Sequence, residues 1–194
     1  LEVRIIMPYT FTYYENDIKE NDLVLVVTQS GLSTNAIEAL KIIKKKECRA
    51  ICLTGNKNSD VKDVADVVIE YGVGEELVGY VTKGVSSLAL FLDLFAIAYS
   101  GKIEYLDELK KAVDLNEEMI DQATSFIQQH YKNFSSMSWV YSCGAGANYG
   151  TALESALKMG ETIHIPSCCY EIEEYIHGPN LQLTPQYNVI FFDG

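Results

Sequence analysis

A continuous apolar run from Leu23 to Val27 constrains the fold of this chain more than any other feature. The run lacks the alternation of a half-exposed strand, so it predicts a parallel strand that is buried on both faces. A loop rich in hydroxyl groups follows, and apolar residues then recur from Ala36 to Ile43 at the spacing of an amphipathic helix. Lysines gather toward the end of this helix, where they complement the helix dipole. These residues therefore predict one strand–loop–helix unit of an α/β fold.

Further strand and helix signals follow in the same alternating order. Strands are expected at Ala50 to Thr54 and at Val67 to Tyr71, with a turn and a short helix near Val61 between them. Thr82 to Tyr99 is strongly helical, and one or two charged helices follow from Ile103 to Tyr131. Alternation of this kind predicts a parallel, doubly wound sheet.

The pattern starts again in the last third of the chain. Trp139 to Cys143 predicts a strand, Thr151 to about Thr162 predicts a helix, and Asn188 to Phe192 predicts a final strand, which indicates a weak internal duplication. Val3 to Met7 also predicts a strand, so we expect the chain to begin inside a domain. The expected organisation is a first module over residues 1–100, a helical connector over 101–135 and a second module over 136–194, each module being incomplete at its outer end.

The charge balance disfavours two classes of partner. The 194 residues are 48% hydrophobic, which is enough for a sizeable core, and they carry 15 basic against 27 acidic side chains. The resulting net charge of −12 argues against nucleic acid and against an anionic membrane, because both need a basic surface. Any anionic ligand must therefore be held locally, by loop amides and hydroxyls.

The cysteines favour a reducing compartment. Their number is odd and they show no paired CxxC spacing, so neither a disulfide framework nor a zinc cluster is indicated. The longest apolar run, Leu88 to Tyr99, is too short to span a bilayer, and no signal peptide opens the chain. We therefore expect a cytoplasmic protein. The cysteines are Cys48, Cys52, Cys143, Cys168 and Cys169.

The loop after the first buried strand is a candidate phosphate site. Hydroxyl side chains surround Gly31 at the start of a helix, where free backbone amides and the positive end of the helix dipole favour an anion. The alternative is that Ser33 or Thr34 only caps the helix, which hydroxyl residues often do. The remaining hydroxyls belong to Thr28 and Ser30.

A second glycine-rich loop has a weaker signal. Gly144, Gly146 and Gly150 superficially resemble a dinucleotide-binding pattern, but the last gap is one residue too long and no acidic residue ends a clear second strand beyond. A nicotinamide cofactor is therefore not expected. The glycines are better explained by a tight turn from a strand into a closely packed helix.

The helix after this loop carries a charged stripe. Glu154, Lys158 and Glu161 recur at spacings of four and three, so they project from one side. Taken alone, the stripe is better explained as a solvated salt-bridge ladder. The segment from Ile163 to Pro179, which we expect to be a loop, favours a functional interpretation because it brings His177 near in sequence. A carboxylate and a histidine together suit proton transfer and ring opening on a sugar phosphate.

Four motifs run through nearly the whole chain: Thr28 to Gly31, Gly79 to Lys83, Ala152 to Lys158 and Glu174 to Pro179. They resemble successive motifs of the sugar isomerase (SIS) domain family. Their order and approximate spacing match those of paired-domain members such as the isomerase half of glucosamine-6-phosphate synthase and the fructoselysine-6-phosphate deglycases. The resemblance implies two flavodoxin-like three-layer αβα modules with parallel sheets, a homodimer that shares its active site, and no metal or redox cofactor.

The resemblance also implies roles for individual residues. Glu161 is the base that moves a proton between C1 and C2, His177 opens the sugar ring, and Lys158 lies close to the reacting carbons. Val81 departs from the synthase pattern, which has serine there, and is closer to the deglycase-like branch. A first phosphate-binding turn of the family is expected before the start of this sequence. The phosphate loop implied by the family consists of Thr28, Gln29, Ser30 and Ser33.

Three functions from different classes remain open. The leading hypothesis is a phosphosugar isomerase or deglycase that acts on a 6-phosphorylated amino sugar or sugar–amine adduct. The second is a phosphosugar-binding regulatory protein of the same fold, which needs the hydroxyl loop but no acid–base pair. The third, a dinucleotide-dependent enzyme, is disfavoured by the glycine spacing.

Overall fold

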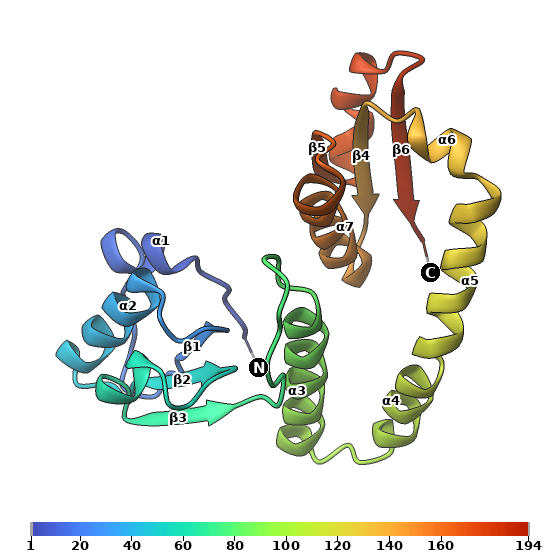
Figure 1. Ribbon diagram of the computed structural model, residues 1–194. Coiled ribbons are helices and arrows are strands. Elements are labelled where there is room, and N and C mark those ends of the chain that lie inside the picture. The colour runs from blue at the N-terminus through green and yellow to red at the C-terminus, as the bar shows by residue number, and fades with distance from the viewer. Residues whose placement is uncertain (1, 194) are drawn as a thin grey trace. The chain divides into compact units, whose positions relative to one another are not determined.

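The computed structural model describes residues 2–193, which divide into two compact units, one up to Asp107 and one from Glu108 onward. Each unit contains its own three-stranded sheet, and all pairings within both sheets are parallel (Figure 1). The α/β class with parallel sheets, which the alternation of strands and helices predicts, is thus confirmed.

The first sheet consists of β1 (Leu25–Thr28), β2 (Ile51–Thr54) and β3 (Val67–Glu70), in that order. Its register pairs Thr28 with Thr54 and Thr54 with Glu70, so all three strands end at the same edge. The helices of this unit are α1 (Pro8–Tyr13), α2 (Thr34–Lys45), the 3-10 helix η1 (Asp60–Asp63) and α3 (Lys83–Ser100).

Helices cover both faces of this sheet. Successive residues of a strand point to opposite faces, so two neighbouring residues of β2 show what packs on each face. Cys52 of β2 packs in one cluster with Leu40 of α2, and both are fully buried. Leu53, the next residue, lies in a cluster on the other face, where Leu88 and Phe91 of α3 pack against it. The first unit therefore has three layers, with the sheet between α2 and α3.

Most of α3 is nevertheless accessible to solvent in this structure. Gly84 is the buried residue of this 18-residue helix. The apolar run from Leu88 to Tyr99 is too short to span a bilayer, but the helix that contains it is longer and, by length and composition alone, could cross a membrane. Core helices of other proteins pass the same test. The contacts of Leu88 and Phe91 with the sheet instead make α3 a layer of the α/β unit.

The second unit contains the parallel sheet β5-β4-β6, with β4 in the centre. Its core is aromatic: the Tyr141 ring is 1% exposed and lies 5.6 Å from the ring of Tyr175, and its hydroxyl donates to Gln182 Oε1 at 2.9 Å. The helices before the sheet are α4 (Tyr105–Asp114), α5 (Asn116–Gln129) and α6 (Tyr131–Ser135). The elements of the sheet region are β4 (Trp139–Gly144), α7 (Ala147–Lys158), the π-helix η2 (Met159–Ile163), β5 (Ser167–Glu171), α8 (Ile172–Ile176), the 3-10 helix η3 (Pro179–Gln182) and β6 (Tyr187–Phe192).

The prediction of a strand at Val3 to Met7 is wrong. This segment is irregular, and Ile5 within it is 93% exposed. A strand needs a partner for its backbone groups, and both strands that pair with β2 lie elsewhere in the chain. Pro8 instead is the first residue of α1. Backbone N–H groups in the first turn of a helix have no partner within the helix, so the missing N–H of proline costs no hydrogen bond there.

The prediction of a loop from Ile163 to Pro179 is also wrong, because this segment contains β5 and α8. Ser167 and the residues after it pair with β4 in parallel, which gives these half-buried residues regular backbone bonds. Glu171 then caps α8 by accepting the backbone N–H of Glu173 at 2.7 Å. In addition, α7 begins at Ala147, earlier than expected, directly after Gly146 with its positive φ of 56°.

Replacing Leu40 by alanine should lower the free energy of unfolding by about 2–5 kcal/mol, because it removes a fully buried side chain between α2 and the sheet. Leu77→Ala is the control, since Leu77 is 87% exposed, and it should change that free energy by less than about 0.5 kcal/mol. Urea denaturation followed by circular dichroism measures both. An equally small effect for the two variants would contradict the packing of α2 on the sheet.

Candidate functional site

The loop from Gln29 to Ser33 joins the end of β1 to the start of α2, at the edge where the strands of the first sheet end. Gly31 lies in this loop with a φ of +68°, and a Cβ there would come within 1.8 Å of Ser59 Oγ. A side chain at this position would therefore be strained and would collide with Ser59. Gly31 O also accepts the N–H of Val61 at 3.3 Å, so the loop is held against the connection between β2 and β3.

The hydroxyls of this loop are not equivalent. Ser33 occupies the N-cap position of α2, but its side chain makes no capping hydrogen bond. Ser30 Oγ accepts the N–H of Leu32 at 3.2 Å, and both serines are exposed. Thr28, by contrast, is buried at the end of β1. The loop therefore presents two accessible hydroxyls beside the first turn of α2, an arrangement that suits an anion.

Both the side chain and the backbone O of Gln29 are engaged in hydrogen bonds within the chain. Its Nε2 donates to Glu76 Oε2 at 2.7 Å, and its backbone O accepts the N–H of Gly55 at 2.9 Å and the hydroxyl of Thr54 at 3.2 Å. A depression of about 540 Å³ opens beside these residues. Its lining includes Gln29, Ser30, Asn56, Glu76 and Val81.

Glu76 is a residue of this region that sequence reasoning missed. The hydrogen bond from Gln29 is the largest cause that lowers the pKa of Glu76 to about 2, and three backbone amides at the start of α3 add to it against partial desolvation. The carboxylate is therefore ionised at neutral pH. The signal available in the sequence was its place after β3, because strands of a parallel sheet bring their carboxyl ends to one edge.

Lys158 and Glu161, which the family resemblance makes site residues, do lie together in the second unit. Lys158 Nζ is 2.6 Å from Glu161 Oε2 and 3.4 Å from Glu154 Oε1, and the lysine side chain is only 20% exposed. Burial alone lowers the pKa of Lys158, but its bonds to the two carboxylates outweigh this effect and raise the pKa above the usual value. Lys158 is therefore a cation in the folded chain.

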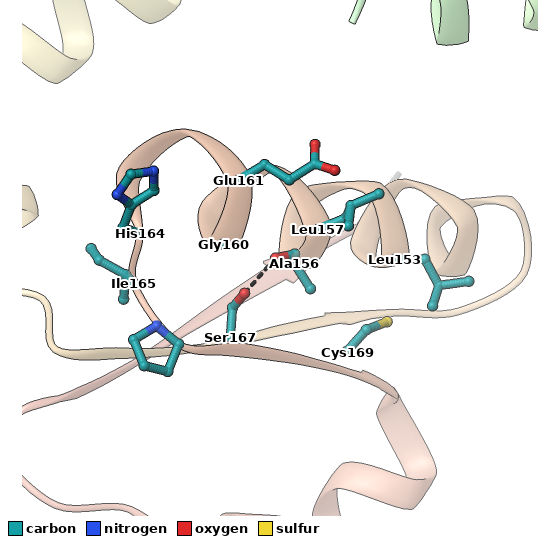
Figure 2. Close-up of a pocket in the computed structure, with 10 residues that line it drawn as sticks. Leu153, Ala156, Leu157, Gly160, Glu161, His164, Ile165, Ser167 and Cys169 are labelled. Carbon is teal, nitrogen blue, oxygen red and sulfur yellow. Dashed lines mark hydrogen bonds between the residues drawn. The ribbon is translucent and has the colours of Figure 1, made fainter. Parts of the chain in front are cut away.

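Glu161 lies in an irregular turn. The π-helix Met159–Ile163 follows directly on α7, and His164 ends it in the left-handed conformation with φ of 61°. Turns of this kind often occur at functional sites. Glu161 and His164 also border a depression of about 720 Å³ between α7 and β5, whose other lining is mostly apolar (Figure 2). The Ser167 hydroxyl, which also lines this depression, donates to Ala156 O.

His177 is not brought to this pair within the chain. It lies at the C-cap of α8, its side chain is 73% exposed, and its Nε2 is 3.9 Å from Glu173 Oε2. Across residues 2–193, no hydrogen bond or ion pair joins His177 to Lys158 or Glu161. The structure thus assembles the lysine–carboxylate pair and the hydroxyl loop separately, and leaves His177 accessible.

Comparisons with known proteins bear on this arrangement. Residues 10–98 match the family model of the SIS domain. The chain is 30% identical over 190 residues to a glutamine–fructose-6-phosphate aminotransferase (isomerizing) of Caldanaerobacter subterraneus subsp. tengcongensis, covering 92% of this chain and 31% of that protein. The enzyme of the same name from Thermotoga maritima is 28% identical over 199 residues, covering 97% of this chain and 32% of the relative. The chain thus spans about a third of the length of these curated relatives.

Solved structures agree with the sequence match. A protein of Clostridium difficile 630 that is assigned as a phosphosugar isomerase aligns with a TM-score of 0.86 and 29% identity, over 96% of this chain and 56% of that one. The C-terminal domain of glucosamine-fructose-6-phosphate aminotransferase from Francisella tularensis aligns with a TM-score of 0.86 over 95% of this chain and 55% of that one, and its 23% identity makes this a likeness of fold. The matched family model thus identifies a SIS domain in residues 10–98, and these relatives are similar to the chain over most of its length.

Proposed function

We propose that this chain forms part of a phosphosugar isomerase or deglycase that acts on a 6-phosphorylated amino sugar or sugar–amine adduct. The observation that carries the proposal is the loop after β1, which leaves the hydroxyls of Ser30 and Ser33 accessible beside the first turn of α2. In a chain with a net charge of −12, a phosphate needs such a local site. The names of the relatives, which refer to fructose 6-phosphate and to phosphosugars, support the substrate class.

In the proposed reaction, Glu161 removes a carbon-bound proton of the open-chain substrate and returns it to the neighbouring carbon, so that the proton moves between C1 and C2. The intermediate is an enediol or, for an amine adduct, an enolamine. Lys158 stays protonated, so it acts as a cation that stabilises developing negative charge rather than as the base. Schiff-base hydrolysis after the proton transfer would complete a deglycation.

Ring opening is assigned to His177. In this proposal His177 acts on substrate bound to a second copy of the chain. The side chain is 73% exposed and contacts Glu173 rather than the Lys158–Glu161 pair, which suits a residue that reaches a site in a partner subunit. The accessible apolar surface of α3 supports such a homodimer. The proposal also takes the second unit as a second SIS-type module and, with five free thiols, the cytoplasm as the compartment.

One alternative function is favoured by a specific observation. Glu154, Lys158 and Glu161 form a continuous salt-bridge ladder, which is what a purely structural helix face would contain. A phosphosugar-binding regulatory protein would keep the hydroxyl loop and need no acid–base pair. Binding without turnover would identify this second function.

Replacing Ser30 and Ser33 together by alanine should weaken binding of fructose 6-phosphate by about 1–3 kcal/mol, because charge-assisted hydrogen bonds to the phosphate are lost. The matched control is Ser135→Ala with Ser136→Ala, two exposed serines of the other unit. Titration calorimetry measures both variants against the wild type. Equal affinity in all three proteins would reject the phosphate site.

Replacing Glu161 by glutamine should lower turnover by roughly 10²–10⁴-fold, because an amide cannot take the carbon-bound proton. Glu154→Gln is the control, since it removes the other carboxylate that pairs with Lys158 and should leave most of the activity. The measurement is exchange of the substrate's carbon-bound hydrogen with deuterated water, followed by NMR. Undiminished exchange in the Glu161→Gln protein would eliminate Glu161 as the base.

The same assay separates the step of His177 from that of Glu161. His177→Asn should cost less activity when the substrate is supplied already open-chain, because ring opening is its assigned step. An equal loss with cyclic and open-chain substrates would contradict that assignment.

A further inference from the structure

The carboxylate of Glu76 joins the loop after β1 to the start of α3. Its Oε2 accepts Gln29 Nε2 at 2.7 Å and the Gly84 N–H at 3.1 Å, and its Oε1 accepts the N–H groups of Thr82 at 2.8 Å and Lys83 at 2.6 Å. A carboxylate offers about four acceptor positions, so these bonds occupy its capacity. Glu76 is therefore unsuited to take a substrate hydroxyl or a proton.

The side-chain amide of Gln29 also packs against the first turn of α3. A Cβ on Gly84 would lie 1.8 Å from Gln29 Oε1, which shows how closely the amide packs on the first turn of α3. Gln29 Oε1 is buried and has no hydrogen-bond partner in residues 2–193. An unpaired buried acceptor is unfavourable, so the charge-assisted bond from Nε2 to Glu76 is the interaction that keeps the amide in this position.

The position of Gln29 in turn fixes the loop that carries the serines. Its backbone O accepts from Gly55 and Thr54 at the end of β2, and Ser30 is the next residue. Gln29 thus connects the ends of β1 and β2, through its backbone O, to the segment between β3 and α3, through its side chain. Lys83 Nζ strengthens that connection by donating to Glu75 O at 2.7 Å.

We infer that Glu76 is a positioning residue for the phosphate loop, which it holds in its binding geometry through the side-chain amide of Gln29. This inference rests on the proposed function, because it assigns Glu76 to the phosphosugar site formed by Ser30 and Ser33. Glu76 itself touches neither the phosphate nor the reacting carbons.

A pH dependence of stability follows from the same bonds. The pKa of Glu76 is about 2 in the folded chain, against about 4.3 for an unperturbed glutamate, so ionised Glu76 favours the folded state above about pH 4.3. That stabilisation is lost as the pH falls from about 4.3 toward 2. Urea denaturation at pH 6 and pH 3 should show a smaller acid loss for Glu76→Gln than for the wild type. An acid loss of the same size in both would contradict the bonds to Glu76.

Titration calorimetry of the full chain with fructose 6-phosphate and glucosamine 6-phosphate tests the role in binding. Glu76→Gln should weaken binding about tenfold or more, because an amide cannot accept all of these bonds. Glu75→Gln removes the same charge from the neighbouring residue, whose carboxylate has no partner in the described chain, and should change the affinity by less than about twofold. Equal affinities for the Glu76→Gln and Glu75→Gln proteins would overturn the inference.

A double-mutant cycle tests whether the effect passes through Gln29. Gln29→Ala should weaken binding to a similar degree, and the combined variant should bind no more weakly than the worse single variant. Additive losses would show that Glu76 acts by another route and would overturn the inference. Gly84→Ala serves if Glu76→Gln does not fold, because its Cβ displaces the Gln29 amide and should also weaken binding.

The failure of the proposed function is distinguishable from the failure of this inference. A wild-type chain that binds neither phosphosugar would refute the proposed function. The position of Gln29 would then be judged by its side-chain amide resonance in ¹⁵N NMR, which should shift in Glu76→Gln and stay unchanged in Glu75→Gln. An unshifted resonance in Glu76→Gln would overturn the inference whatever the binding result.

Discussion

Parallel pairing of β1 with β2 and of β2 with β3 is the constraint on which the first candidate site depends. The register places Thr28 beside Thr54 and Thr54 beside Glu70, so the loops that follow the three strands leave the sheet at one edge. Backbone bonds then tie these loops together, as when Gly55 donates to Gln29 O at 2.9 Å. If one of these strands ran antiparallel, the loop after it would leave from the opposite edge, and the serine loop would be separated from Glu76.

Local patterns predicted most of the sheet strands because these strands are short, apolar runs bounded by turn residues. The strand at Val67 and that at Trp139 begin where expected, and α2 follows its hydrophobic spacing closely. The pattern misled at Val3 to Met7, since an apolar run becomes a strand only where a neighbour supplies hydrogen bonds. It misled again at β5, because half-buried cysteines and flanking prolines resemble a loop until pairing with β4 is known.

The candidate site was predictable only where chemistry is local. The serine loop could be recognised because a glycine, hydroxyls and a helix start are consecutive, and the pair of Lys158 with Glu161 because their spacing fits one helix face. Glu76 is separated from Gln29 by 47 positions, so no periodicity connects them. The roles of Glu161 and His177 came from family resemblance, and the ladder that contains Lys158 is compatible with either a catalytic or a structural helix face.

The hydrogen bonds of Glu76 also resolve an apparent conflict between the charge of this loop and its proposed function. A phosphate loop in an acidic chain gains nothing from a further carboxylate nearby, because like charges repel. Here the carboxylate is surrounded by donors from Gln29 and the start of α3, so its charge is compensated locally. The first turn of α3 donates to this internal anion, whereas Ser33 at the start of α2 makes no side-chain capping bond. In the proposed function the two helix starts therefore differ, because that of α3 binds the Glu76 carboxylate and that of α2 binds the phosphate.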